Sequence, residues 1–308
     1  MSAVLGRRQV LLVAAVTLFW GLNWPVMKLA VGAWPPMSFR AVSMWLGLPC
    51  LALGLWVLKA PFAVPRAQWR LVAGLAFTNM VAWHVCLMWA LPHLSSGRAA
   101  ILGYTMPLFS ALWGRALYGV RLTGVQALGL ACAGLGVGLL LWHELARLSG
   151  SPVAVFTMLA GTAVWALGTQ QLSRAPLAVP ALTLSFWMTA LTTVVVTLLA
   201  LATEGLPLAL PGPAVSWAIA YNAVLVFGFC HAAWFGLART LPPVASSISI
   251  TMIPVLGLLA GAAALGEVLH WQDGVAIGSL VAGLALTLRR RAFEADQVHI
   301  DPPLRQTL

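Results

Sequence analysis

Long apolar runs joined by short connections constrain the fold of this chain more than any other feature. A helix needs about 20 mostly apolar residues to cross the roughly 30 Å hydrocarbon core of a bilayer. Hydrophobic residues make up 61% of the 308 positions and charged residues only 8%, which excludes a soluble domain of this length. We therefore predict an all-α polytopic membrane protein with ten transmembrane helices. The expected spans are 10–31, 37–58, 69–91, 96–118, 122–142, 153–173, 181–202, 214–237, 242–265 and 272–288.

The distribution of positive charge supports this number of spans. If the N-terminus is cytoplasmic, thirteen of the seventeen Lys and Arg residues fall on the cytoplasmic side and three on the external side, with Arg40 inside the second span. This asymmetry follows the positive-inside rule, and an odd number of spans would destroy it. We therefore expect both termini in the cytoplasm. The net charge of +10 then reflects membrane orientation, and we expect no nucleic-acid partner.

The chain contains an internal repeat. A shift of 147 residues pairs His84 with His231, Pro107 with Pro254, Gly114 with Gly261 and Gly136 with Gly283. This divides the chain into a first five-helix repeat (1–148), a second five-helix repeat (149–290) and a cytoplasmic tail (291–308). Because five is odd, the two repeats must insert with opposite orientation. Inverted repeats are typical of secondary transporters, which alternate between two states around one midplane site.

Polar and aromatic side chains at membrane depth mark the expected substrate pathway, because such groups usually face a bundle interior or a watery cavity. In the stretch FWGLNWPVMK (19–28), the side chains of Trp20, Asn23 and Trp24 share one helix face. Three prolines are expected to let helices bend: Pro25, Pro107 and Pro254. The expected substrate-binding residues are Trp20, Asn23, Trp24, Asn79, Trp83, His84, Tyr104, Trp165, Thr169, His231, Trp234 and Ser246.

Several of these residues also have a purely structural interpretation. Ser and Thr often bond to the backbone of their own helix. His84 and His231 could instead serve as neutral hydrogen-bonding groups between helices. Arg40 lies close enough to the external end of its span to snorkel to the surface, which we favour over a role as counter-ion for a carboxylate.

The second, fifth, seventh and tenth spans are expected to form a scaffold without substrate contacts. The fifth span carries Gly134 and Gly138, and the tenth carries Gly274 and Gly278, in each case four residues apart. Small residues at this spacing let two helices approach closely. We therefore expect helix-packing or assembly surfaces there.

Missing groups narrow the chemistry further. No Asp or Glu lies deep in any predicted span, which argues against a carboxylate-based proton antiporter for cations. The four cysteines lack the spacing of a metal site, so we expect no metal and no cofactor. His84 and His231 lack an embedded acidic partner, so we expect no catalytic residues and no enzyme. Aromatic faces with a few polar groups fit a neutral or zwitterionic substrate.

One late segment resembles a known family. The stretch SSISITMIPVLGLLAGAAALGEVLHWQDGVAIGSLVAG (246–283) is similar to the second half-domain of the drug/metabolite transporter superfamily, EamA-type family. FWGLNW (19–24) looks like the first-span motif of this family, whereas Val120 stands where the first half would have its glutamate. The resemblance implies two inverted repeats, with spans 1, 3, 4, 6, 8 and 9 around a cavity and spans 5 and 10 to one side. Glu267, in an external loop, is expected to cap or pack.

The resemblance also implies a function. It suggests export of amino acids or related metabolites across a bacterial inner membrane, and the many tryptophans point to the aromatic amino acid and paraquat exporter branch. We expect facilitated efflux of aromatic and other neutral amino acids by alternating access. The alternative is an exporter of organic cations such as paraquat, coupled to protons through a histidine. The expected partners are the substrate and the lipid bilayer, and nothing in the sequence requires more than a monomer.

Overall fold

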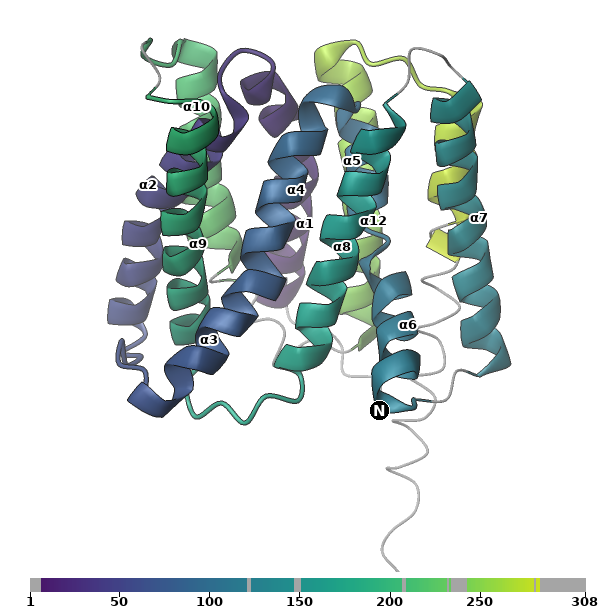
Figure 1. The fold of residues 1–308 in the computed structure, drawn as a ribbon. Helices are drawn as coiled ribbons and strands as arrows, with labels where there is room; N and C mark the ends of the chain where they lie inside the picture. The colour runs from purple at the N-terminus through teal and green to yellow at the C-terminus, as the bar shows by residue number, and fades with distance from the viewer. Residues whose placement is uncertain are drawn as a thin grey trace, which may run out of the picture.

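The computed structural model describes residues 7–120, 123–146, 151–206, 209–231, 233, 243–279 and 281–282. All regular elements within these ranges are helical, and Figure 1 shows most of them side by side in a single bundle. Six segments are long and apolar enough to cross a membrane: Gln9–Val31, Pro36–Val57, Arg66–His93, Pro152–Leu172, Ala181–Thr203 and Pro213–Cys230. The predicted all-α polytopic fold is confirmed.

In the first half, the fourth predicted span is not one helix. It is divided into α5 and α6 at Tyr104 and Thr105. Pro107 has no N–H to donate to the carbonyl of Gly103, and its ring would collide with that carbonyl in a continuous helix. The helices of this half are α1 (Arg7–Val31), α2 (Pro36–Val57), η1 (Arg66–Gln68), α3 (Trp69–Ala76), η2 (Phe77–Val81), α4 (Ala82–Ala90), η3 (Leu91–His93), α5 (Ser96–Gly103), α6 (Met106–Tyr118) and α7 (Gly124–Ala146).

The second half repeats this plan. Its helices are α8 (Pro152–Leu172), α9 (Ala181–Thr203), α10 (Pro213–Tyr221), η4 (Asn222–Cys230) and α12 (Pro243–Leu265), followed by a helical segment at 271–279. The predicted cytoplasmic tail at 291–308 lies outside the described residues.

Contacts at the helix ends show that the two halves run in opposite directions. At the end of α1, the Lys28 ammonium donates to the carbonyl oxygens of Leu91 and Pro92, at 3.0 and 2.8 Å, where the third span ends. At the end of α8, Gln68 at the start of the third span donates its amide to the Pro176 carbonyl at 3.4 Å. The first helices of the two halves therefore end at opposite faces of the bundle. This is the arrangement that inverted repeats require.

Each half also contains a π-helical segment at an equivalent position. The shift of 147 residues places η2 (Phe77–Val81) on residues 224–228, inside η4 (Asn222–Cys230). The two histidines of the repeat, His84 and His231, follow these segments directly or within one turn. A π turn takes up one extra residue and is frequent at functional sites. Matched residue identities had indicated the repeat, and the structure shows that the two halves also share a π-helical segment at the same position.

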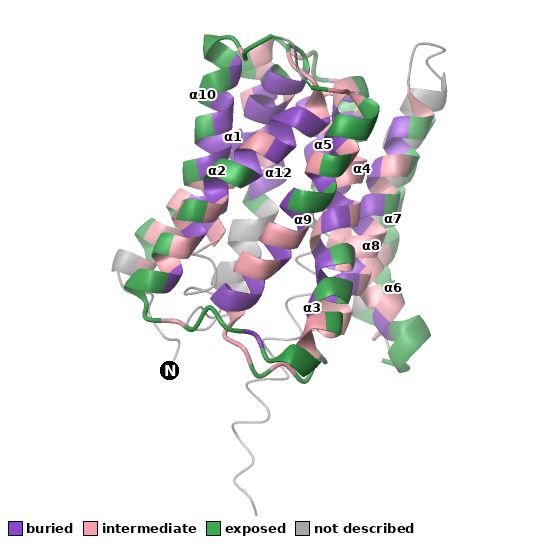
Figure 2. Ribbon diagram, turned by 60° about the vertical axis from the view of Figure 1, so that its left-hand side comes forward, coloured by how far each residue is buried: buried purple, intermediate pink, exposed green. Residues whose placement is uncertain are grey.

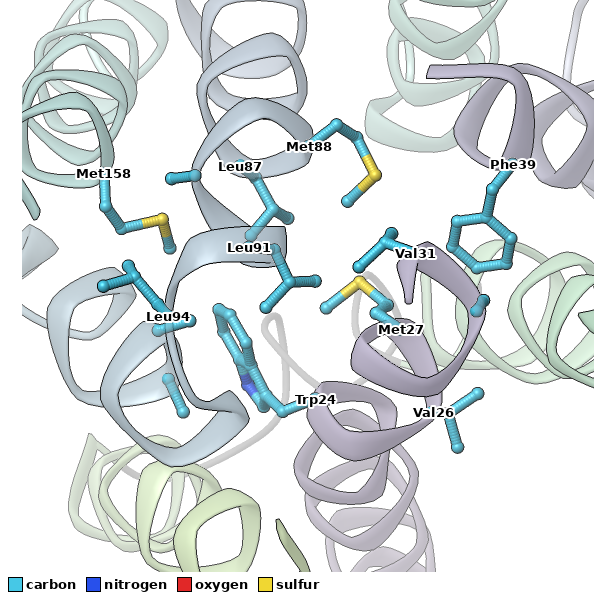
Figure 3. Close-up of a cluster of buried hydrophobic side chains, with 14 of the residues drawn as sticks. Trp24, Val26, Met27, Val31, Phe39, Leu87, Met88, Leu91, Leu94 and Met158 are labelled. Carbon is cyan, nitrogen blue, oxygen red and sulfur yellow. The ribbon is translucent and has the colours of Figure 1, made fainter. Parts of the chain in front are cut away.

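Apolar side chains from both halves fill the space between the central helices. Figure 3 shows Trp24 and Met27 of α1 close to Leu91 and Leu94, with Met158 of α8 nearby, and all five are buried. Large apolar side chains also cover the outside of the bundle, where Figure 2 shows exposed positions along the outer helix faces. An apolar exterior around a filled core is what a lipid environment favours.

Helix α7, which corresponds to the fifth predicted span, stands to one side of the bundle together with the segment 271–279 (Figure 1). A Cβ at Gly136 would lie 3.0 Å from the Ala276 carbonyl oxygen, so this glycine makes the close contact between the two helices. Gly134, Gly138 and the glycines at 274 and 278 do not provide it, because a Cβ at any of them would meet no described atom within 4 Å, and an assembly surface at these glycines stays a prediction. Gly134 and Gly138 instead line a shallow outer groove.

Candidate functional site

Four aromatic residues, which we call the aromatic cluster, meet near the middle of the bundle: Trp24, Trp83, Tyr104 and Trp165. The Trp83 and Trp165 rings lie 4.9 Å apart and join α4 to α8 of the other half. The Trp24 ring meets the Tyr104 ring edge-on at 6.5 Å. Gly103 lies between the pairs, since a Cβ there would be 2.9 Å from the Trp83 ring and 3.1 Å from the Trp24 ring. Four predicted site residues are thus brought together.

A second aromatic contact joins the two halves through histidine. The Trp20 ring lies edge-on to the His231 ring at 6.1 Å. His231 stacks on Phe227 at 5.6 Å with nearly parallel planes, and its Nδ1 is 2.8 Å from the Val226 carbonyl oxygen. The His84 ring lies 6.0 Å from the same Phe227 ring. Both histidines of the repeat therefore pack on Phe227, a buried side chain that the predicted site did not include.

Arg40 does not snorkel, contrary to the sequence-based expectation. Only 2% of the residue is exposed. Its Nη1 donates to Asn222 Oδ1 at 3.4 Å and its Nη2 to the Met27 sulfur at 2.7 Å, while the guanidinium carbon lies 5.7 Å from the centre of the Phe227 ring. Because α2 directs this side chain inward, the second span is not only a scaffold. The helix position showed how deep Arg40 lies, but not which way it points.

Four buried polar atoms near the centre have no hydrogen-bond partner among the described residues. They are Asn23 Oδ1, Arg40 Nε, Ser43 Oγ and His84 Nδ1. Leaving a buried polar atom unpaired costs roughly 1–3 kcal/mol, so such atoms in a folded protein need an explanation. A transported molecule or water that visits these atoms would provide one.

Other polar residues of the predicted site donate hydrogen bonds to the backbone of their own helices. The Asn79 amide donates to the Leu75 carbonyl at 3.0 Å, and the Thr169 hydroxyl donates to the Trp165 carbonyl at 3.0 Å. Asn79 also packs on Gly168, where a Cβ would lie 2.6 Å from its amide nitrogen. These contacts are those of residues that pack helices together. Trp234 lies outside the described residues, and for Ser246 the structure describes the backbone in α12 but not the side chain.

The three predicted hinge prolines occupy different settings. Pro25 lies inside α1 and Pro254 inside α12, and both helices continue through them. Pro107 is in the first turn of α6, directly after the break that separates this helix from α5. Among the three, it alone coincides with a change of helix.

Two carboxylates of the second half hold helix N-termini of the first half at one face of the bundle. Glu267 accepts from the Ser96 backbone N–H at 2.7 Å and from the Ser96 hydroxyl at 2.8 Å, at the start of α5. Glu204 accepts from the Met37 and Ser38 backbone N–H groups, both at 2.8 Å, at the start of α2. A carboxylate at a helix N-terminus accepts hydrogen bonds from the free N–H groups and interacts favourably with the positive end of the helix dipole. The capping role expected for Glu267 is confirmed.

Comparison with known proteins identifies the family. The sequence model of the EamA-like transporter family matches residues 7–142 and again 152–289. This chain belongs to the EamA-like transporter family. YedA, an uncharacterised inner membrane transporter of Escherichia coli strain K12, is 28% identical over 92% of both chains. YoaV, an uncharacterised transporter of Bacillus subtilis strain 168, is 20% identical over 81% of this chain and 86% of its own. A crystal structure with 20% identity covers 92% of this chain and 97% of the other with a TM-score of 0.64, which supports the fold.

As a member of the EamA-like transporter family, the chain is a membrane transporter, and its central residues lie where the two family domains meet. Trp83 and Trp165, Trp20 and His231, and Arg40 with Asn222 each pair one domain with the other. The sequence indicated the aromatic members through their depth and spacing. The predicted site left out Phe227 and Ser43, because an apolar ring and a small hydroxyl are ordinary in any apolar helix.

Proposed function

We propose that this EamA-like transporter exports aromatic and other neutral amino acids, or related metabolites, across the inner membrane of a bacterium. In this proposal both termini are cytoplasmic and the two domains alternate access by moving around the aromatic cluster. The observation that carries the proposal is the cluster itself: two aromatic pairs on either side of Gly103, of which Trp83–Trp165 spans the seam between the domains. Flat apolar surfaces beside a few polar groups suit an aromatic side chain with a polar end.

The state of the two faces supports alternating access. At the face that the charge pattern predicts to be external, Glu204, Glu267 and Lys28 tie helices together through short polar contacts. Deeper in the bundle, Trp20, Tyr104 and Trp165 are only partly buried. In this proposal, a molecule on the predicted cytoplasmic side reaches the cluster while the external face is closed. Domain motion that opens the external contacts would release it.

Facilitated efflux is the simplest mode of transport for this arrangement. The described carboxylates whose contacts are known, Glu204, Glu267 and Asp273, lie at the helix ends and not beside the aromatic cluster. Proton-coupled export of an organic cation through histidine is the alternative, and the unpartnered Nδ1 of His84 is the observation in its favour. A buried Arg40 near His84 and Phe227 opposes it, because like charge repels a permanent cation.

The test is counterflow of labelled tryptophan and leucine in proteoliposomes, with and without an imposed pH gradient. We expect flux without a gradient. Trp165→Ala should weaken the apparent affinity for tryptophan by about two- to tenfold, since an aromatic pair contributes about 0.5–1.5 kcal/mol beyond its buried area. Trp142→Ala is the matched control, because Trp142 lies on α7 with 69% of its surface exposed. Both variants should elute and melt as folded protein.

The outcomes separate the alternatives. Flux that appears only with a pH gradient would contradict facilitated efflux and direct mutagenesis to His84 and His231. Transport of methyl viologen without transport of either amino acid would replace the proposal by organic-cation export. Equal kinetics for Trp165→Ala and the parent protein would remove the aromatic cluster from the pathway.

A further inference from the structure

Arg40 is a cation buried in the membrane part of the protein, with no anion beside it among the described residues. Of the described carboxylates, none pairs with its guanidinium, and its acceptors are an amide oxygen at 3.4 Å and a thioether sulfur. Sulfur is a weak acceptor, and the amide contact is long. Burying a charge is unfavourable unless it is paired and hydrogen-bonded. The folded protein therefore maintains a charge that its own residues leave uncompensated.

The free side of the guanidinium is suited to a carboxylate. Among the described residues, Nε has no partner, and Nη2, on the same edge of the fork, donates to the Met27 sulfur alone. This edge can donate two parallel hydrogen bonds to the two oxygens of one carboxylate, which is the strongest pairing that arginine makes.

The neighbouring groups complete a polar site. Ser43 is one turn along α2 from Arg40 and fully buried, and its hydroxyl has no partner in the part of the chain that the structure describes. Gly47, one turn further, faces Phe227 so closely that a Cβ there would lie 2.7 Å from the Phe227 Cβ. This face of α2 therefore points to η4, where Phe227 also packs on His84 and His231.

We propose that Arg40 binds the carboxylate of the transported molecule, with Ser43 as a further donor to it. This deepens the proposed function and rests on it for the transport step. The substrate class is then a carboxylate that carries a flat apolar group, as a zwitterion or as a simple organic acid. Organic cations without an anionic group are excluded, because they would meet the unpaired guanidinium. The carboxylate compensates the charge of Arg40 while the apolar group reaches the aromatic rings.

The experiment compares three compounds that share an indole ring and a two-carbon chain and differ in their charged groups: tryptophan (carboxylate and ammonium), indole-3-propionate (carboxylate only) and tryptamine (ammonium only). Each is measured as a competitor of labelled tryptophan counterflow and as a ligand that raises the melting temperature of the purified protein. The wild-type protein should bind the two carboxylates and bind tryptamine at least about tenfold more weakly, the factor expected for hydrogen bonds to a charged group. This comparison of ligands uses the wild-type protein alone.

Variants then assign the effect to one side chain. Arg40→Gln should weaken both carboxylates by roughly 10- to 100-fold and remove the discrimination against tryptamine. Arg40→Lys keeps the charge but loses the fork, so we expect an intermediate loss. Arg174→Gln, which removes an exposed arginine that lies over Tyr118, is the matched control and should behave as wild type.

The outcomes distinguish this inference from the proposed function. Equal binding of tryptamine and tryptophan by the wild-type protein would overturn the inference while leaving amino acid export intact. Binding of indole-3-propionate with no response to any amino acid would overturn amino acid export while supporting Arg40 as a carboxylate receptor. Unchanged carboxylate affinity in a folded Arg40→Gln protein would also overturn the inference.

Discussion

Removing the Glu267 carboxylate should open the face of the transporter that it closes. Glu267 holds Ser96 through one backbone and one hydroxyl hydrogen bond, at 2.7 and 2.8 Å, with a weaker contact to the Gly97 N–H at 3.4 Å. Because the acceptor is charged, each short bond contributes about 1.5–3 kcal/mol. Two such bonds would total about 3–6 kcal/mol, but the carboxylate is partly exposed and solvent screens it, so we take about 2 kcal/mol as the net loss in Glu267→Ala.

That loss has a conformational consequence. The bonds connect the segment after α12 to the first turn of α5, so they exist only while the two domains are closed at this face. Since about 1.4 kcal/mol corresponds to a factor of ten, the open state should gain roughly thirtyfold relative to the closed state. Glu267→Gln keeps an acceptor but loses the charge, and we expect a smaller gain.

The assay is the rate at which a membrane-impermeant maleimide modifies a cysteine placed at Ala30, in a background without native cysteines. Ala30 is fully buried, two residues beyond Lys28 near the end of α1. Labelling from the external side of right-side-out vesicles should rise at least tenfold in Glu267→Ala. Trp271→Ala, an exposed residue of the same region, is the control. An unchanged labelling rate combined with a lower melting temperature would refute the reasoning, since the cap would then stabilise α5 without controlling closure.

Further predictions concern close packing. Gly103→Val should slow counterflow by at least tenfold, because a Cβ only 2.9 Å from the Trp83 ring displaces the indole. The control is Gly134→Val on α7, where a Cβ meets no described atom within 4 Å. It should transport normally in the same assay. Gly168→Ala should destabilise the protein by about 1–3 kcal/mol, as overpacking does, because a Cβ would lie 2.8 Å from the backbone carbon of Thr78. Thermal unfolding in detergent measures it, and an unchanged melting temperature would contradict the packing argument.

Long apolar runs were sufficient to predict the all-α polytopic fold of this transporter, because a chain that spans lipid must form long apolar helices. The orientation that the charge pattern indicates stays a prediction. Apolar runs and charge could not predict where a helix changes type. The break at Tyr104 and Thr105 follows from Pro107, yet Pro25 and Pro254 lie inside continuous helices. The neighbours that re-satisfy the backbone around a proline come from the tertiary structure.

Only part of the site could be predicted from the sequence, for a similar reason. Depth and spacing indicated Trp24, Trp83 and Trp165, since large aromatic residues on one face of a deep helix have few other roles. The same information placed Arg40 near a membrane surface and favoured snorkelling. Its inward direction depends on how α2 is rotated against η4, which the close approach of Gly47 and Phe227 determines. No local pattern in the sequence records that rotation.

The matched π-helical segments have a consequence for the register of the third and eighth spans. An α-helix turns by about 100° per residue, so one residue accommodated in a π turn rotates every later side chain by that angle relative to an uninterrupted helix. Residues before and after Phe77–Val81 therefore follow two different periodic phases, and the same holds around Asn222–Cys230. A single-residue deletion in either segment would restore one phase. In the third span it would also turn His84 about a quarter of a turn away from Phe227, which lies on another helix.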